Sequence, residues 1–339
     1  MNEVLEMSSA KQIALLSVAL FIPVFVFLGA CSKETPKVQR VGILSGLDYI
    51  SEAADGFTTK MTELGYIEGK NIIYDQQKTD FDMAAYKSIL KKFVADKVDL
   101  IFVFPTEAAQ EAKAATQGTN IPVVFTIANI EDTGLVESVQ KPGGNITGVR
   151  YPGPDIALKR FEILHELAPR VKRMWIPYQR GYPIVNSQLK ALHPVAASMG
   201  VTLEEAPADN AAELKSILDA RARSADIGMD AILALAEPLF VTPDAFAVMC
   251  MFAAEHRIPI AGALIEVEGC GSVFGVHIHN ANTGAQAASL ADKVLKGTPA
   301  GTIPVASAEG YFQLNFKLAQ ELGLNVSEGM LSVAHEIIR

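Results

Sequence analysis

The chain has 339 residues, of which 50% are hydrophobic and 20% are charged. This length and this amount of apolar material suit two packed domains better than one. The formal net charge is −9 and the isoelectric point is about 5.3. Binding to a phosphate backbone needs a clustered basic surface, whereas the basic residues here form nothing longer than pairs such as Lys91-Lys92. Nucleic acid is therefore not expected as a partner.

Residues 1–30 carry the pattern of a cleaved signal peptide. The charge-free run IALLSVALFIPVFVFLGA covers residues 13–30 and ends directly before Cys31. The sequence Leu-Gly-Ala-Cys at the end of this run resembles a lipobox, in which the cysteine receives a diacylglyceryl group before the leader is removed. The alternative is a single transmembrane anchor, because a run of this length can just span a bilayer. The small residues before the cysteine favour the lipoprotein, with translation starting at Met1 or Met7.

A short polar tether, residues 31–39, follows the leader. We therefore expect the mature chain to hang from a membrane surface outside the cytoplasm. Two further cysteines, Cys250 and Cys270, could pair in an oxidising compartment. Cys250 lies in FAVMCMF, a predicted buried helix, where an inert apolar thiol is the usual state. This pattern favours unpaired cysteines and leaves a disulfide open.

From residue 40 onward, apolar strand patterns alternate with amphipathic helix patterns. Predicted strands cover residues 40–44, 71–75, 99–104, 121–128, 173–178, 201–206, 230–236, 258–263 and 272–278. Predicted helices cover residues 51–64, 86–94, 155–167, 185–199, 214–222 and 243–256, and one more begins at Thr106. A turn-rich loop, residues 140–148, interrupts the alternation. Strands that are apolar on both faces are typical of parallel sheets covered by helices, so we expect two α/β lobes joined near residues 148–153.

The sequence lacks the common motifs of nucleotide binding and of nucleophilic catalysis. It contains no G-x-G-x-x-G after the first strand, no phosphate-binding G-x-x-x-x-G-K-[ST] loop and no G-x-S-x-G elbow. His277 and His279 are two residues apart on a predicted strand and share a face, which could hold a metal or line a polar cleft. No further ligands at metal spacing accompany them, so we expect neither a metal nor a cofactor.

Polar and aromatic residues follow several predicted strands at their carboxyl ends, the edge where open α/β sheets bind ligands. The candidate ligand-binding residues are Ser45, Leu47, Asp48, Tyr49, Pro105, Thr106, Glu107, Ala128, Asn129, Tyr178, Tyr182, Glu237, Phe240 and His277. They provide hydroxyls, amides, aromatic rings and helix N-termini. This chemistry suits the binding of a small polar ligand and gives no catalytic constellation, so an enzyme is not expected.

The candidates suggest how a zwitterion would bind. Thr106 opens a helix whose free backbone N–H groups favour a carboxylate, although Glu107 opposes an anion there unless its side chain points away. Glu237 could receive an ammonium group. The residues available to pack on an apolar or aromatic side chain are Tyr49, Tyr178, Tyr182 and Phe240. In the alternative interpretation, Glu237 caps the following turn and the tyrosines are ordinary surface residues.

The stretch ELGYIEGKNIIYD, residues 63–75, resembles a signature of the ABC-transporter substrate-binding lipoproteins whose best-known members bind tryptophan and other aromatic amino acids. The resemblance continues over nearly the whole mature chain, in residues 98–116, 121–149, 256–276, 291–305 and 312–326. Within the signature, Gly65 has the position of a helix C-cap, so the joint itself is structural.

The resemblance implies a type I periplasmic-binding-protein fold, with two Rossmann-like lobes and a ligand cleft at the hinge. It implies an N-terminal lobe of residues 40–150 with 280–300 and a C-terminal lobe of 151–279 with 301–339. It also implies a monomer that is lipid-anchored through Cys31 to the cell membrane or the outer membrane and that serves an ABC permease with its ATPase.

The sequence departs from the family pattern at three predicted strand exits. These segments are FPTE at 104–107, ANIED at 128–132 and YQRGYPIVN at 178–186. Because strand exits are the ligand-binding edge, an aromatic ligand cannot simply be carried over from the family. A lipid-anchored sensory receptor of the same fold and, less favoured, an α/β enzyme are the rival interpretations.

Overall fold

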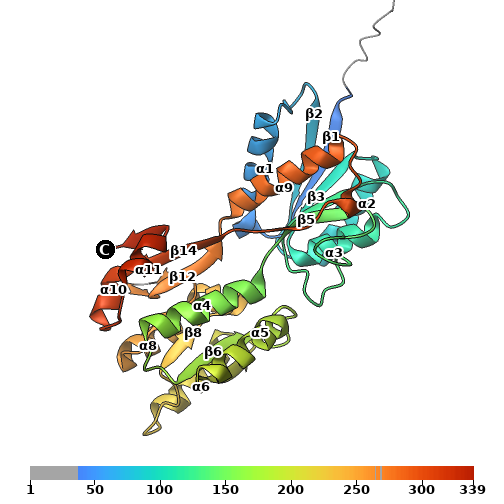
Figure 1. Cartoon of the computed structure of the whole chain (residues 1–339). Helices are drawn as coiled ribbons and strands as arrows, with labels where there is room; N and C mark the ends of the chain where they lie inside the picture. The colour runs from blue at the N-terminus through green and yellow to red at the C-terminus, as the bar shows by residue number, and fades with distance from the viewer. Residues whose placement is uncertain (1–36, 264, 268) are drawn as a thin grey trace, which may run out of the picture. The chain divides into compact units, whose positions relative to one another are not determined.

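The structure, a computed structural model, describes residues 37–339 except residues 264 and 268. The leader and Cys31 therefore lie outside the described residues. Among the helices that are described, none is long and apolar enough to cross a membrane. The elements form one unit, Val38–Arg339 (Figure 1).

The first lobe is built on a parallel six-stranded sheet with the strand order β13-β5-β4-β3-β1-β2. Its strands are β1 (Gln39–Ser45), β2 (Ile72–Lys78), β3 (Leu100–Phe104), β4 (Val123–Ala128), β5 (Ile146–Arg150) and β13 (Ala306–Ser307). Its helices are η1 (Asp48–Ile50), α1 (Glu52–Glu63), α2 (Met83–Ala95), α3 (Thr106–Ala115), α9 (Asn280–Leu295) and η2 (Ala300–Thr302). Every residue of β3 is buried, as expected for a strand covered by helices on both faces.

Two details of this lobe differ from the sequence expectations. The loop predicted for residues 140–148 ends early, because Ile146–Arg150 forms the buried strand β5. Gly148 belongs to this strand, and a Cβ at that position would lie 2.3 Å from the carbonyl oxygen of Phe125. Its glycine therefore permits close strand packing and does not form a turn. The short strand β13 also joins this sheet beyond residue 300, by pairing with Val149 and Arg150.

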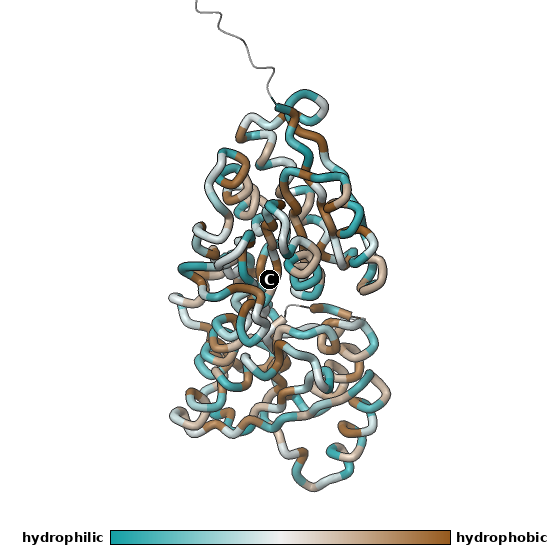
Figure 2. The backbone as a smooth tube through the Cα atoms, turned by 90° about the vertical axis from the view of Figure 1, so that its right-hand side faces the viewer, coloured by the Kyte–Doolittle hydropathy of each residue, from teal (hydrophilic) through white to brown (hydrophobic). Residues whose placement is uncertain are grey.

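The second lobe is built on a parallel sheet with the order β7-β6-β8-β9. Its strands are β6 (Arg173–Gln179), β7 (Thr202–Ala208), β8 (Ala231–Leu233) and β9 (Ile260–Ala261). Its helices are α4 (Gly153–Leu167), α5 (Val185–Ser198), α6 (Ala211–Ala222), α7 (Pro238–Val241) and α8 (Pro243–His256). In Figure 2, hydrophobic and hydrophilic residues alternate along the helices, which is the pattern of elements with one face on a core.

A three-stranded sheet continues the second lobe through a bridge between Gly262 and Gly275. Its strands are β12 (Phe274–Ile278), β14 (Gly310–Asn315) and β15 (Glu336–Ile338), accompanied by α10 (Phe316–Glu321) and α11 (Glu328–Val333). The chain passes between the lobes three times, from β5 to α4, from β12 to α9 and from β13 to β14 (Figure 1). The ligand site described below lies against these crossings.

The joint after α1 connects the first lobe to its last helix. Gly65 has a φ of 94°, the left-handed conformation of a helix C-cap glycine, and the N–H of Tyr66 returns to the carbonyl of Met61. The Tyr66 hydroxyl then donates to Asp292 on α9 over 3.1 Å. Helix α9 lies beside α1 in Figure 1, so this joint holds two elements that are far apart in the sequence.

The sequence left the pairing of Cys250 and Cys270 open and favoured free thiols, and the structure contradicts that preference. The two residues form a disulfide, with Cα atoms 5.9 Å apart. A small hairpin of β10 (Glu266–Val267) and β11 (Cys270–Gly271) turns the chain back onto α8, where Cys250 lies. The apolar helix around Cys250 was identified correctly, but the hairpin that carries Cys270 to it has only two-residue strands. Strands this short leave no periodicity to detect.

Candidate ligand-binding site

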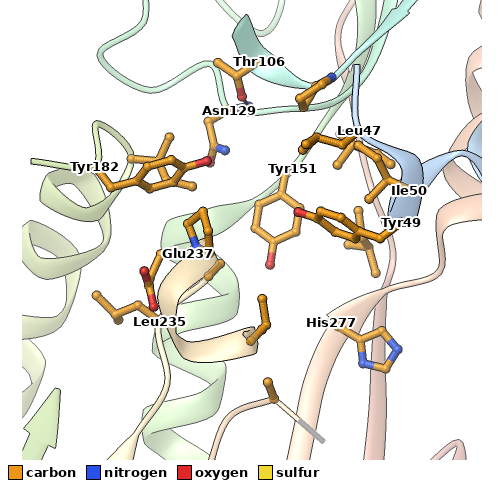
Figure 3. A pocket seen from close by; sticks show the side chains of 18 of the residues that line it. Leu47, Tyr49, Ile50, Thr106, Asn129, Tyr151, Tyr182, Leu235, Glu237 and His277 are labelled. Carbon is orange, nitrogen blue, oxygen red and sulfur yellow. Dashed lines mark hydrogen bonds between the residues drawn. The ribbon is translucent and has the colours of Figure 1, made fainter. Parts of the chain in front are cut away.

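A cavity of about 260 Å³ lies between the lobes, just below the ~300–1,000 Å³ that is usual for small-molecule sites. The first lobe contributes Leu47, Tyr49, Ile50, Pro105, Thr106, Glu107, Ile127, Asn129 and Asn280 to its lining. The second lobe and the crossings contribute Tyr151, Arg160, Tyr182, Ile184, Leu235, Ala236, Glu237, Pro238, Val241, Ala263, His277 and Ile278. Figure 3 shows the labelled side chains around a common space.

The structure places most of the predicted site residues in this lining. These are Leu47, Tyr49, Pro105, Thr106, Glu107, Asn129, Tyr182, Glu237 and His277. They come from the exits of several strands, and parallel strands in each sheet end at the same edge.

Five predicted site residues are not part of the lining. Ser45 is buried and donates to the carbonyl of Leu47, Ala128 belongs to the core, and Asp48 is exposed. Tyr178 donates its hydroxyl to Glu205 on β7, 2.9 Å away. Phe240 is fully buried and packs edge-on against Phe246 in the second-lobe core.

The first-lobe end of the cavity is formed by the start of α3. Pro105 occupies the N-cap without a side-chain cap, and the first intrahelical bond runs from Ala109 to Pro105. The Thr106 hydroxyl accepts a hydrogen bond of 3.0 Å from the backbone N–H of Asn129, which fixes the strand exit against the helix start. Asn129 is 5% exposed, and its side-chain oxygen has no hydrogen-bond partner among the described residues.

Glu107 belongs to the lining at this same end, and its carboxyl group acts electrostatically on Tyr49 and Tyr182, which line the same cavity. Burial raises the pKa of this carboxyl group, and only the hydrogen bond from its own backbone N–H opposes the rise. The ion pairs of the described residues include none that involves Glu107. Within the described part of the chain, this carboxyl group therefore has no cationic partner.

Glu237 caps the turn that follows it, which is the alternative interpretation of this residue from the sequence. It is the N-cap of α7 and accepts from the backbone N–H groups of Leu239 at 2.9 Å and Phe240 at 2.6 Å. The N–H of Gln179 donates to the same carboxylate over 2.9 Å. Burial raises the Glu237 pKa, while these backbone donors act in the opposite direction. Its charge is thus largely satisfied within the protein, although the residue also lines the cavity.

Arg160, which the sequence interpretation did not include, is the cation of the site. This residue of α4 is 3% exposed and lines the cavity. Its Nε and Nη2 donate to the Val276 carbonyl at 2.9 and 2.7 Å, and its Nη1 donates to the Ala234 carbonyl at 3.2 Å. A guanidinium has five N–H groups, so one on each terminal nitrogen is left for the cavity. Burial lowers the pKa of Arg160, opposed by the nearby Tyr151 and Glu237.

The sequence contained a pattern that could have identified Arg160 as a site residue. Ile156, Ala157 and Phe161 form the buried face of the helix, and Arg160 falls on that same face. A charged residue on an apolar helix face is rarely buried unless it has partners, so it marks a polar site.

Three tyrosine rings line the cavity together with aliphatic side chains. The side chains of Tyr49, Tyr151 and Tyr182 extend into the same space in Figure 3, from the first lobe, a crossing and the second lobe. Burial raises the pKa of Tyr151 and of Tyr182, so both phenols are neutral at physiological pH. Tyr49 is 69% exposed, which places it at the mouth. Neutral phenols offer an apolar ring and one hydrogen-bonding group each.

His277 lines the cavity from β12, whereas His279 is the N-cap of α9, so only the first belongs to the strand. Both rings contact Tyr311, with centroid separations of 5.4 and 6.2 Å. Burial is the main cause that lowers the pKa of His277, followed by Arg160 and His279, so the ring is neutral near pH 7. The described residues contain no group of three or more His, Cys, Asp or Glu that could hold a metal ion.

Comparisons with known proteins agree with this architecture. A tyrosine-binding protein of Clostridioides difficile (strain R20291) is 29% identical over 285 residues, which cover 81% of this chain and 78% of the relative. A solved domain of Streptococcus pneumoniae in complex with L-Trp has a TM-score of 0.72 at 24% identity and covers 89% of this chain and 100% of its own. A ligand-free, open substrate binding protein with adhesive properties from Clostridium difficile has a TM-score of 0.73 at 24% identity, with coverage of 89% and 99%.

The family model of the ABC transporter substrate binding proteins matches residues 38–338. The structure has the two-lobed type I periplasmic-binding-protein fold of its structural neighbours. Proteins of this family are extracytoplasmic substrate-binding subunits and not enzymes. The chain belongs to the ABC transporter substrate binding protein family.

Proposed function

We propose that this protein binds an amino acid, or a similar small zwitterion with an aromatic or branched side chain, and delivers it to an ABC permease. The observation that carries the proposal is the cavity itself, which combines tyrosine rings and aliphatic walls with the buried Arg160 and the partly buried Glu107. An apolar pocket with a few convergent polar groups is the usual form of a small-molecule site. The similarity to a tyrosine-binding protein supports the same ligand class.

A thermal-shift screen of L-tyrosine, L-tryptophan, L-phenylalanine and L-leucine tests this ligand class. A ligand present at about 100 times its dissociation constant should add roughly 2.7 kcal/mol of apparent stability. Calorimetry would then compare two variants. Tyr182→Ala removes a ring from the cavity and should weaken binding about tenfold or more. Tyr178→Ala removes a ring that contacts Glu205 outside the cavity and should bind as the wild type does. Failure of every amino acid to bind the wild type would contradict the proposal.

We further propose that the mature chain is a monomeric lipoprotein that begins at Cys31. The support is the charge-free run before Leu-Gly-Ala-Cys, a polar tether after it and the membership of an extracytoplasmic family. The lobes, residues 40–150 with 280–307 and residues 151–279 with 308–339, would then close on the ligand about the three crossings.

Replacing Cys31 with alanine should abolish incorporation of a labelled fatty acid, because the thiol is the acceptor of the lipid. Metabolic labelling followed by gel analysis measures this, and the double variant Cys250→Ala/Cys270→Ala, which keeps Cys31, should still be labelled. Acylation of the Cys31→Ala protein would refute the lipoprotein assignment.

A further inference from the structure

The two ends of the cavity carry opposite charges. The ends differ in the partners that the protein provides for each charge. At the first-lobe end Glu107 has no ion pair among the described residues. At the second-lobe end the partners of Arg160 within the described residues are the carbonyls of Val276 and Ala234, which leave two of its five N–H groups free of them. Glu107 raises the pKa of Tyr49 and Tyr182, whereas Arg160 lowers that of Tyr151.

The start of α3 also lies at the Glu107 end, and its positive dipole would by itself favour an anion. The dipole amounts to roughly half a unit charge at the helix N-terminus, against a full negative charge on an ionised Glu107. The sum at this end is negative, so a ligand carboxylate is disfavoured there. The Arg160 guanidinium carries a full positive charge in a buried setting, with Glu237 near it, and its remaining N–H groups are the donors available to a ligand carboxylate.

Glu237 is the other carboxylate of the lining, and it competes with Glu107 for a cationic group. Three backbone N–H groups already donate to Glu237, two from α7 and one from Gln179. Such donors stabilise the ionised carboxylate and occupy its lone pairs. Among the described residues, the one group that stabilises the ionised Glu107 is its own backbone N–H, so Glu107 is the carboxylate whose charge a ligand would satisfy.

We propose that Glu107 binds the ammonium group of the ligand from the first lobe, while Arg160 binds the ligand carboxylate from the second lobe. This assignment rests on the proposed function and reverses the polarity expected from the sequence. With this assignment, the ammonium and the carboxylate of one ligand bind to different lobes and so connect them. A molecule that lacks either charge would leave Arg160 or the partly buried Glu107 without its ligand partner, which selects zwitterions against simple acids and amines.

The test compares L-tyrosine with 3-(4-hydroxyphenyl)propionate, which lacks the ammonium group, and with tyramine, which lacks the carboxylate. If the screen finds a different preferred amino acid, the corresponding analogues of that amino acid are used. The Glu107→Gln substitution should lower the affinity for L-tyrosine and for tyramine by at least about 30-fold, and it should change the affinity for the propionate by less than about threefold. The matched control is Glu111→Gln on the same helix, because Glu111 pairs with Lys87 at 3.7 Å outside the cavity lining.

Arg160→Lys keeps the buried charge but replaces the planar fork by a single ammonium. This substitution should lower the affinity for L-tyrosine and for the propionate and leave the affinity for tyramine unchanged. Two results would overturn this assignment without affecting the proposed function. One is that the Glu107→Gln variant binds L-tyrosine as strongly as the wild type does, and the other is that this variant loses binding of the propionate. If the wild type binds none of the amino acids, the proposed function and this assignment both fall, a result that is distinct from either variant outcome.

Discussion

Replacing Arg160 with leucine is expected to lower the free energy of unfolding by about 2–6 kcal/mol, even in the absence of ligand. The substitution removes the donors of two buried carbonyl groups, those of Val276 and Ala234, and each unpaired buried acceptor costs about 1–3 kcal/mol. An apolar replacement of a whole ion pair can be neutral, but here the carbonyl partners remain. Equilibrium unfolding in urea measures the change.

Lys159→Leu is the matched control for this prediction. Lys159 is the preceding residue on the same helix, and its side chain is 59% exposed, so the change should stay within about 0.5 kcal/mol. Arg160→Lys should fall between the two, because one ammonium retains the charge and only part of the hydrogen bonding. An Arg160→Leu protein that unfolds at the wild-type urea concentration would show that the guanidinium does not support the crossing.

Removal of the Cys250–Cys270 disulfide is the second large effect. The bridge closes a segment with a sequence separation of 20, and a loop of that size restricts the unfolded chain by about 3 kcal/mol. The double variant Cys250→Ala/Cys270→Ala should lose that stability in urea unfolding. Wild-type protein treated with a reductant should lose a similar amount, and the double variant should not respond to the reductant at all.

The thiol count gives an independent check of the same bridge. In a Cys31→Ala background, the oxidised protein should react with no thiol reagent after unfolding, and the reduced protein should react at two positions. Two reactive thiols in the oxidised, unfolded chain would refute the bridge. Equal unfolding curves for the wild type and the double variant would instead show that the bridge adds no stability.

The sequence by itself determined the alternating α/β architecture and the edge of the sheets where the cavity lies. These features depend on local patterns, since the period of an apolar run fixes an element and its buried face. The exit of each parallel strand then predicts a position at one sheet edge, as for Thr106, Asn129 and Tyr182, which line the cavity. The signature around Gly65 indicated the family without touching the site.

Only the tertiary structure decided which side chains share the cavity and what their charges contact. Tyr178 and Tyr182 belong to one strand-exit segment, yet only Tyr182 reaches the cavity. Arg160 reaches its partners across sequence separations of 74 and 116 residues, and Cys250 meets Cys270 through a hairpin of two-residue strands. The period of an element fixes its own faces but not the distant backbone groups that oppose them. The charges at the two ends of the cavity are therefore set by the packing of the lobes and not by any local motif.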